Sequence, residues 1–327
     1  MLNNNHLIIS LHLKPAIHDP DTSFADPVTF FMSDVLIFVP SIKNKYSEME
    51  TKKVWFVTGA SKGLGFELVK KLLSEGYRVA ATSRTVGSLA ASFGEASEQF
   101  LPLGMNITDN NDVKYSLART VEHFGKVDVI VNNAGYGQLG TLEELTDEEA
   151  RANFDVNVFG SLNVIRNAMP YLRKQQSGNI FNISSIGGYA GNFPGWGIYC
   201  STKFAVAGFT EALAEEAKAF GIHATVVYPG YFRTDFLTRE SAKTPAYTIE
   251  AYESARNSEQ AHLKEINGNQ PNDPVKAADA LIALSKEQDP PVHFLLGIET
   301  NEFLTNKIEA MTKDAQNWKS LTESTAL

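Results

Sequence analysis

Residues 54–83 hold the pattern that most constrains how this chain can fold. An apolar run, Val54–Thr58, is followed by a glycine-rich turn at Gly59–Gly65, an amphipathic helix to about Glu75 and a second apolar run at Arg78–Ser83. A short apolar run bounded in this way is typical of a strand that is buried on both faces. Two such strands joined by a crossover helix predict a parallel βαβ unit.

The alternation of apolar runs and helical patterns continues along the chain. Further strands are expected at 100–103, 127–132, 179–184, 223–228 and 293–297, and helices at 109–124, 147–173, 199–220, 274–286 and 301–318. Strands that alternate with helices require right-handed crossovers and a parallel sheet. Neither repeats nor a polar linker divide the region, so residues 51–327 predict one α/β domain. We expect a Rossmann fold whose doubly wound parallel sheet is flanked by helices.

Composition narrows the class of protein. The chain has 327 residues, of which 43% are hydrophobic and 20% charged, as in ordinary globular proteins. A net charge of −9 argues against a general nucleic-acid binder. The apolar runs Leu7–Ile9 and Val35–Val39 are too short to span a bilayer, and no secretory signal is recognisable. The one cysteine, Cys200, excludes an internal disulfide and fits a cytoplasmic protein. We therefore expect no membrane, nucleic-acid or metal partner.

Residues 1–50 differ in composition from the rest of the chain. They contain the Asn3–Asn5 tract, prolines at 15, 20, 27 and 40, and no sustained helical or strand period. Such a segment buries too little apolar surface to offset its ordering entropy, so we expect a disordered N-terminal extension. A regulatory or targeting arm is one alternative. A stretch translated from upstream of a natural start at Met49 is another.

The glycines of the 59–65 turn predict an anion site. One permits the tight turn, another lets the backbone approach a pyrophosphate, and another lets the helix pack closely on the strand. The following helix begins with unpaired N–H groups and a positive dipole end, which favour phosphate. The turn therefore predicts dinucleotide binding.

Tyr199 and Lys203 form a second functional pattern. Four residues apart on an expected helix, they project from the same face. A neighbouring cation should lower the pKa of a phenol below its usual value of about 10, so that Tyr199 could exchange a proton with a substrate oxygen. The alternative is an exposed ion-pairing helix face. Cys200 beside Tyr199 is either a reactive thiol or a small packing residue, and we expect packing.

Polar and glycine clusters follow the expected strands, at the edge where open parallel sheets bind ligands. These clusters are Asn132–Gly135, Ser184–Ser185 and Pro229–Gly230. Together with Thr58-Gly-x-x-x-Gly-x-Gly65, Asn157 and Tyr199-x-x-x-Lys203, they make the chain resemble the classical short-chain dehydrogenase/reductase family. The resemblance runs from about Lys53 to at least Asp235 and does not cover the first 50 residues.

The resemblance implies catalytic roles for four residues. Tyr199 would be the general acid in carbonyl reduction and the general base in alcohol oxidation. Lys203 would lower the pKa of Tyr199 and bind the nicotinamide ribose. Ser185 would hydrogen-bond the substrate oxygen, with Ser184 as the competing candidate. Asn157 would hold a water that links Lys203 to solvent.

The resemblance also implies a set of cofactor-binding residues. These are Gly59, Ser61, Lys62, Gly63, Leu64, Gly65, Ser83, Arg84, Asn106, Ile107, Asn132, Ala134, Gly135, Tyr199, Lys203, Pro229, Gly230 and Thr234. Asn106 stands where family members usually carry an aspartate near the adenine. NAD-preferring folds place a carboxylate at the end of the second strand, and this chain has none at 82–85. Arg84 and Lys62 offer cations to a 2′-phosphate instead, so NADP is the expected cofactor.

The substrate is less constrained by the sequence. A long connection from Phe232 to about Asn272 has the length of a lid, and in the family this region closes over the substrate. It and its base carry the aromatic residues Tyr231, Phe232, Phe236, Tyr247 and Tyr252. A second aromatic set, expected to line the pocket, comprises Tyr189, Phe193, Pro194 and Trp196. Such walls favour an apolar or ring-bearing carbonyl compound.

These observations predict an NADP-dependent oxidoreductase that interconverts a carbonyl compound and an alcohol by hydride transfer. Its partner would be a small molecule, and a homo-oligomer remains open. One alternative is a catalytically silent NADP-binding regulatory protein of the same fold. Another, an extended sugar-nucleotide epimerase, is disfavoured by the three-residue gap between the first two glycines and by the lack of a separate C-terminal domain.

Overall fold

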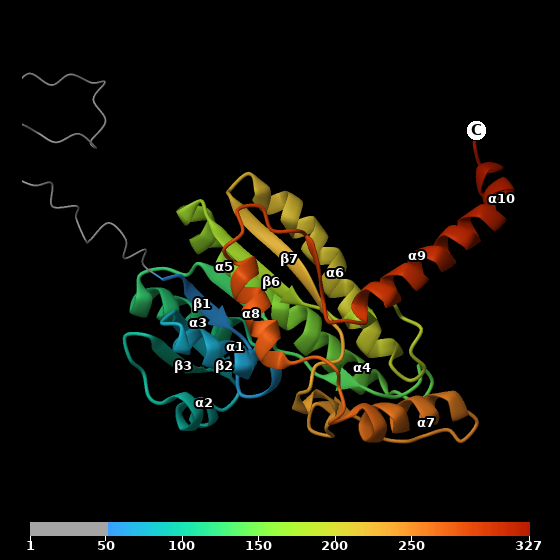
Figure 1. The fold of residues 1–327 in the computed structure, drawn as a ribbon, viewed down its shortest axis with the longest axis horizontal. Coiled ribbons are helices and arrows are strands. Elements are labelled where there is room, and N and C mark those ends of the chain that lie inside the picture. Colours follow the sequence, from blue (N-terminus) through green and yellow to red (C-terminus); the bar gives the residue numbers. More distant parts are fainter. Residues whose placement is uncertain (1–51) are drawn as a thin grey trace, which may run out of the picture. The chain divides into compact units, whose positions relative to one another are not determined.

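Seven parallel strands form the central sheet of the computed structural model, which describes residues 52–327 (Figure 1). The strands are β1 (Val54–Val57), β2 (Arg78–Ser83), β3 (Phe100–Gly104), β4 (Val129–Asn132), β6 (Gly178–Ile183), β7 (Ile222–Pro229) and β9 (His293–Leu296). Their order is β3-β2-β1-β4-β6-β7-β9, so the winding direction reverses between β1 and β4. The predicted doubly wound Rossmann fold is confirmed.

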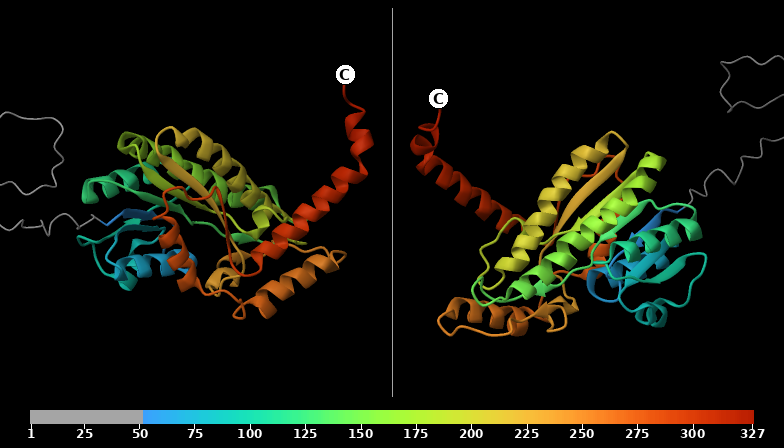
Figure 2. Two further views of the ribbon diagram at one scale, coloured as in Figure 1. Left: turned by 45° about the horizontal axis from the view of Figure 1, so that its top comes forward. Right: turned by 180° about the vertical axis from the view of Figure 1, so that it is seen from behind.

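Helices cover both faces of the sheet because its strands are apolar on both sides. Side chains alternate along β1, so Trp55 and Val57 join one core cluster while Val54 and Phe56 join the other. The first cluster is covered by α1 (Gly63–Ser74), α2 (Val86–Phe93) and α8 (Pro274–Leu284). The second is covered by α3 (Asn110–Phe124), α5 (Gly160–Gln175) and α6 (Gly197–Lys218). Figure 2, seen from behind, shows α5 and α6 in front of the sheet.

The helix predicted over 147–173 is wrong in its middle. It consists of α4 (Asp147–Phe154), a π-helical turn η1 (Asp155–Phe159) and α5. Thr146 and Glu149 close a capping box at the start of α4. The π turn contains Asn157, whose side chain hydrogen-bonds the backbone of Tyr136. A contact between residues 21 positions apart does not alter the spacing of apolar residues, so the sequence pattern could not reveal the π turn. Turns of this kind often lie at functional sites.

The long connection after β7, hereafter the insertion (residues 232–272), is a closed loop. It contains η3 (Asp235–Leu237), β8 (Ala242–Lys243), α7 (Glu253–Gln260) and the π turn η4 (Ala261–Ile266). Its ends meet in a bridge between Phe232 and Asn272, where Arg233 N donates to Asn272 O at 2.9 Å. The bridge therefore fastens the two ends of the insertion to each other.

The insertion is fastened to the chain that follows β4. β8 pairs in parallel with β5 (Gly137–Gln138), a two-stranded sheet that the sequence analysis did not predict. Glu144 is fully buried and receives Arg256 Nη2 of α7 at 2.7 Å. Its carboxylate also accepts from Thr141 N at 2.8 Å and from Ile249 N at 2.7 Å. These contacts place the insertion beside the carboxyl edge of the sheet.

The C-terminal part leaves the body of the domain. After β9 the chain forms α9 (Thr300–Asn317) and α10 (Lys319–Glu323), and every residue from Ile308 onward is exposed. In Figure 1 α9 projects away from the sheet. Within residues 52–327 we find no helix whose length and apolar character would let it cross a membrane. The expected disordered extension over residues 1–50 lies outside the described residues.

Candidate active site

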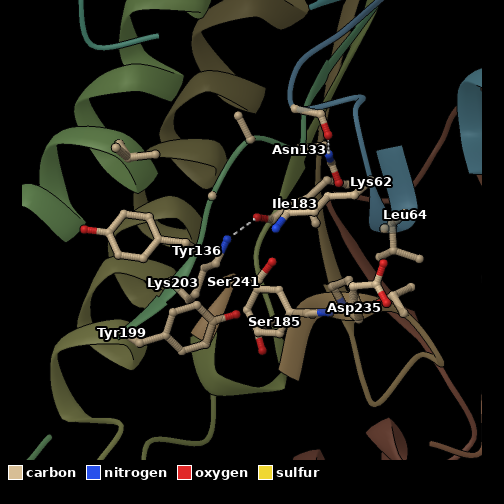
Figure 3. Close-up of a pocket in the computed structure, with 18 of the residues that line it drawn as sticks. Lys62, Leu64, Asn133, Tyr136, Ile183, Ser185, Tyr199, Lys203, Asp235 and Ser241 are labelled. Atoms are coloured by element: carbon tan, nitrogen blue, oxygen red, sulfur yellow. Dashed lines mark hydrogen bonds between the residues drawn. The ribbon is translucent and has the colours of Figure 1, made fainter. Parts of the chain in front are cut away.

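A cavity of about 420 Å³ lies at the carboxyl ends of β1, β4, β6 and β7. Figure 3 shows Ser185, Tyr199 and Lys203 directed into it, from the end of β6 and from α6. The predicted cofactor residues that line it are Gly59, Ser61, Lys62, Gly63, Leu64, Ser83, Arg84, Asn106, Ile107, Ala134, Gly135, Tyr199, Lys203, Pro229, Gly230 and Thr234. The reversal of winding between β1 and β4 opens this space.

The glycine turn is shaped for close approach. Gly59 has φ of +66°, and a Cβ on it would lie 2.7 Å from Ala134 Cα. A side chain on Gly65 would overlap Asn133, so Gly65 serves the packing of α1 and does not line the cavity. The first N–H groups of α1, like those of any helix, have no intrahelical acceptor. Among the described residues no side chain caps them at Lys62, so they are available to a ligand. This geometry fits a bound pyrophosphate.

Asn133 ties the first turn to the turn after β4. Its side-chain amide donates to Thr58 O at 2.9 Å and Gly59 O at 3.1 Å, and its backbone amide donates to Thr58 Oγ1 at 3.0 Å. Asn132, which we predicted to lie near the cofactor, does not line the cavity. It is buried and donates to Asn182 Oδ1 at 2.8 Å. The side-chain alternation of strands explains this correction, since it turns Asn132 toward the face covered by α6, where Asn182 Nδ2 in turn donates to Thr210 Oγ1.

Tyr199 is buried, and Ser185 lines the cavity close to it. Burial raises the pKa of Tyr199, and the neighbouring Ser185 hydroxyl offsets this only in part. Burial also lowers the pKa of Lys203 to about 8. Lys203 Nζ donates to Ile183 O at 2.8 Å and lies 5.7 Å from the centre of the Tyr199 ring (Figure 3). The expected lowering of the Tyr199 pKa by Lys203 is therefore wrong for this structure, because desolvation dominates both groups.

The two candidate serines have different surroundings. Ser184 Oγ donates to the carbonyl oxygen of Lys203 at 2.8 Å and is buried, so it fastens β6 to α6. Ser185 Oγ accepts from Gly187 N at 3.1 Å and contacts Tyr199. Of the two serines, Ser185 is therefore the one whose hydroxyl is not used to join β6 to α6, and its role toward a substrate stays a prediction. Burial raises the pKa of the Cys200 thiol to about 12, which fits a packing residue.

Asn157 lies behind the cavity wall and not on it. Its Oδ1 accepts from Tyr136 N at 3.0 Å, and its Nδ2 donates to Tyr136 O and Thr202 Oγ1, both at 3.0 Å. A Cβ on Gly135 would lie 3.0 Å from Asn157 Oδ1 and 3.6 Å from Lys203 Nζ. Asn157 therefore braces the loop that covers Lys203, and its water-holding role stays a prediction.

The corner at the end of β2 is polar and open. Ser83 Oγ donates to Thr85 O at 2.7 Å and accepts from Thr85 N at 3.1 Å. Arg84 is exposed and, within the described part of the chain, forms no ion pair. Lys62 Nζ lies 3.6 Å from Glu240 Oε2 of the insertion, with 41% of the lysine side chain and 85% of the glutamate side chain exposed. No sequence motif pointed to Glu240 at this corner.

The opposite end of the cavity is aromatic. Phe193 and Trp196 line it as predicted, together with Tyr231, Phe236 and His262. Tyr189 and Pro194 do not, and that prediction is wrong.

Tyr189 and Pro194 lie outside the cavity for different reasons. The Tyr189 hydroxyl donates to Thr300 O at 2.7 Å and its ring packs on Tyr228, while Pro194 is exposed. His262 lies in a π turn and belongs to no motif, so no sequence signal pointed to it. Among residues 52–327 no cluster of three or more His, Cys, Asp or Glu side chains could hold a metal.

Comparisons with known proteins fit this geometry. The short chain dehydrogenase family profile matches residues 53–245. Oxidoreductase BOA17 of Botryotinia fuckeliana is 34% identical over 277 residues, covering 84% of this chain and 99% of that protein. A solved short-chain dehydrogenase from Streptomyces avermitilis is 32% identical, with a TM-score of 0.76 over 85% of this chain and 100% of its own. A 3-ketoacyl-(acyl-carrier-protein) reductase from Brucella melitensis, solved with NADH, is 26% identical, with a TM-score of 0.61 over 75% of this chain and 95% of its own. The chain therefore belongs to the short-chain dehydrogenase/reductase family of oxidoreductases.

Proposed function

We propose that this protein is an NADP-dependent oxidoreductase that interconverts a carbonyl compound and an alcohol, with Tyr199 as the acid and base. The observation that carries the proposal is that Ser185, Tyr199 and Lys203 all face the cavity that the glycine turn also lines (Figure 3). Two hydroxyl groups that face the same cavity can both hydrogen-bond a single substrate oxygen.

The residues present fit a nicotinamide dinucleotide. The N-terminus of α1 and the turn at Gly59–Gly63 would hold the pyrophosphate, and Lys203 would reach the ribose next to the reacting ring. The bound nicotinamide supplies or accepts the hydride. The chain itself supplies orientation and the proton.

The protonation states near pH 7 are those that carbonyl reduction requires. Because burial raises the pKa of Tyr199, its hydroxyl keeps its proton near pH 7 and can donate it to a carbonyl oxygen. Ser185 would donate to the same oxygen and stabilise the charge that develops there. Lys203, with a pKa near 8, is mostly protonated at pH 7 and adds positive charge beneath the site.

The choice of NADP over NAD rests on the corner at the end of β2. Arg84 lines the cavity there with an exposed guanidinium, and Ser83 occupies the position at which a carboxylate would hold the ribose hydroxyls. Lys62 adds a second cation, although it shares its charge with Glu240. A 2′-phosphate carries more negative charge than a carboxylate, so it would compete with the exposed Glu240 side chain for Lys62.

The insertion is proposed to act as the substrate lid. It supplies Phe236 and His262 to the aromatic end of the cavity and is anchored through Arg256 to the buried Glu144. A lid of this kind excludes water from the reacting carbonyl.

A panel of ketones and aldehydes with NADPH and NADH, followed by cofactor absorbance, tests the proposal. We expect oxidation of NADPH by several apolar or ring-bearing members, and a higher kcat/KM with NADPH than with NADH. Consumption of neither cofactor across the panel would favour the catalytically silent NADP-binding protein of the same fold.

A further inference from the structure

The aromatic end of the cavity contains a hydrogen-bonded couple, Tyr231 and His262. The Tyr231 hydroxyl oxygen lies 3.0 Å from His262 Nε2, and His262 Nδ1 lies 2.7 Å from the carbonyl oxygen of Ser258. A carbonyl oxygen can only accept, so Nδ1 carries the imidazole proton and Nε2 accepts the Tyr231 proton. Both residues line the cavity. The Tyr231 oxygen therefore offers lone pairs, and no proton, to a bound molecule.

Both members of the couple are neutral near pH 7. Burial raises the pKa of Tyr231 to about 12, with a smaller contribution from Glu299. Burial lowers the pKa of His262, and the hydrogen bond with Ser258 offsets this only in part. A neutral acceptor on a desolvated wall suits a neutral donor, since a charged group would lose more hydration than it regains.

The surroundings of the couple are aromatic. The His262 ring lies 4.9 Å from the Trp196 ring and 6.5 Å from the Phe193 ring, measured between centroids. Trp196 in turn packs against Tyr199 with ring centroids 5.5 Å apart. The couple and the proposed acid are thus separated by one indole ring. Trp196 is almost fully buried but lines the cavity, so a flat apolar group in the cavity could lie against it and reach both ends.

The couple is also held firmly from the C-terminal side. The Tyr231 amide donates to the Glu299 carboxylate, and the Tyr231 carbonyl accepts from Asn272 Nδ2 at 2.9 Å. The same Asn272 amide donates to Glu299 Oε2 at 2.8 Å. A side chain on Gly230 would overlap the Glu299 carboxylate, so this clamp requires glycine there. A subsite fixed in this way discriminates between ligands at a low entropic cost.

We propose that Tyr231 and His262 form a specificity subsite that accepts a hydrogen bond from a hydroxyl group on a ring-bearing ketone. The ring would lie on Trp196, and the reacting carbonyl would lie at Ser185 and Tyr199. The proposal rests on the proposed function for the identity of the reacting group. The subsite itself concerns which ketone binds.

Ligand sets that differ in one substituent test the subsite. Each set is an aryl ketone with a ring hydroxyl, a methoxy group or hydrogen at the position remote from the carbonyl. Calorimetry gives Kd for each ketone in the presence of the oxidised form of whichever cofactor binds more tightly. Ketone and oxidised cofactor cannot react, so the measurement does not depend on turnover.

Tyr231→Phe removes one oxygen and leaves the ring in place. We expect this variant to bind the hydroxylated ketone roughly tenfold more weakly than wild type, because a neutral hydrogen bond is lost. The Kd of the unsubstituted ketone should change by less than about twofold, because this ketone makes no hydrogen bond that the substitution could remove. Cofactor affinity and melting temperature serve as controls for the fold.

His262→Phe makes the opposite test, because it keeps a ring against Trp196 and removes the acceptor of the Tyr231 proton. Tyr231 could then donate, so the ratio of methoxy to hydroxyl affinity should rise several-fold over wild type. The comparison is made between variants, so the larger size of the methoxy group cancels. If His262 only packed the cavity wall, its replacement would leave this ratio unchanged, and that result would contradict the subsite.

The subsite and the proposed function fail in different ways. An unchanged hydroxyl-to-hydrogen ratio in Tyr231→Phe would overturn the subsite, whatever the turnover of wild type. A wild type that binds the ketones with the expected ratios but reduces none of them would overturn the proposed function and leave the subsite standing.

Discussion

The two ends of the cavity are built in different ways. The cofactor end is made of strand ends and backbone: the Gly59–Gly65 turn, the N-terminus of α1 and the Asn133 hydrogen bonds to the first turn. The substrate end is made of aromatic side chains, several of which come from the insertion. In the proposed function, the first end would bind what is common to nicotinamide dinucleotides, and the second would decide which small molecule reaches them. Cofactor binding would then depend on the backbone of the sheet, and substrate choice on side chains of the insertion.

The difference predicts that substitutions at one end should leave the other end nearly unaffected. Tyr199 stands between the ends, since it belongs to α6 and contacts both Ser185 and Trp196. Variants at the junction, at the cofactor end and at the substrate end should thus give separable losses of kcat, cofactor affinity and KM.

Tyr199→Phe should have the largest effect. It removes the proposed proton donor without changing ring volume, so kcat for ketone reduction should fall by about 10²–10⁴. The NADPH Kd, measured by fluorescence titration, should stay within about twofold, because the proton is needed only in the reaction. Retention of most turnover would remove Tyr199 from the mechanism.

Ser83→Asp combined with Arg84→Ala should reverse the cofactor preference. Loss of a charge-assisted contact weakens binding by about 10- to 150-fold, and solvent exposure favours the lower figure. The new carboxylate would accept the ribose hydroxyls of NADH and repel a 2′-phosphate. The measurement is kcat/KM for both cofactors in wild type and variant, with the ketone KM as the control at the other end. A wild type that already prefers NADH would contradict our interpretation of this corner.

The contrast between the two ends also explains what the sequence could predict. The alternation of strands and helices, the glycine turn and the Tyr199–Lys203 face depend on residues within a few positions of each other, so pattern and resemblance were sufficient. We predicted Asn132 near the cofactor, but Asn133 is the asparagine that lines the cavity. Successive side chains along a strand point to opposite sides, so a shift of one residue decides which of them faces the cavity. The effect of burial on Tyr199 needed the packed environment, which spacing on a helix does not contain.

The substrate end depended on contacts between distant parts of the chain. Glu144 and Arg256 are 112 residues apart, and Tyr231 and His262 are 31 apart. Neither pair has a period or a motif, and the β5–β8 pairing involves two residues on each side. The insertion could be predicted to exist, but its internal pairing could not.

Arg256→Met sharpens the comparison from the substrate end. The change keeps an apolar stem but leaves the buried Glu144 with only its backbone donors. Breaking a buried pair typically costs about 3–5 kcal/mol, and we expect the lower figure because those donors remain. The ketone KM should rise several-fold while the NADPH Kd is unchanged.

The control for Arg256→Met is Arg151→Met. Its ion pair with Asp147 is exposed, with 74% and 69% of the side chains accessible, so its loss should cost at most about 1 kcal/mol. Melting temperature and ketone KM are measured for both variants. An equal loss of cofactor affinity in Arg256→Met would mean that the two ends are coupled, against our comparison.

Lys203→Met should change the stability of the fold by less than Arg256→Met does, and the change should be a gain. Burial lowers the pKa of Lys203 from 10.5 to about 8, and each pKa unit corresponds to about 1.4 kcal/mol, so the charged lysine costs the folded state about 3 kcal/mol. The variant also loses the hydrogen bond to Ile183 O, worth about 1 kcal/mol, which leaves a net stabilisation of about 2 kcal/mol near pH 7.

Between pH 8 and 10.5 the unfolded chain binds the proton that the folded protein has released, so wild type gains stability as pH rises. The advantage of the variant should therefore be constant below about pH 8 and shrink above it, while ketone reduction is lost at every pH. Denaturant unfolding of both proteins from pH 6 to 10 measures this difference, and an advantage that grew with pH would show that Lys203 is not held in a desolvated, pKa-lowered state.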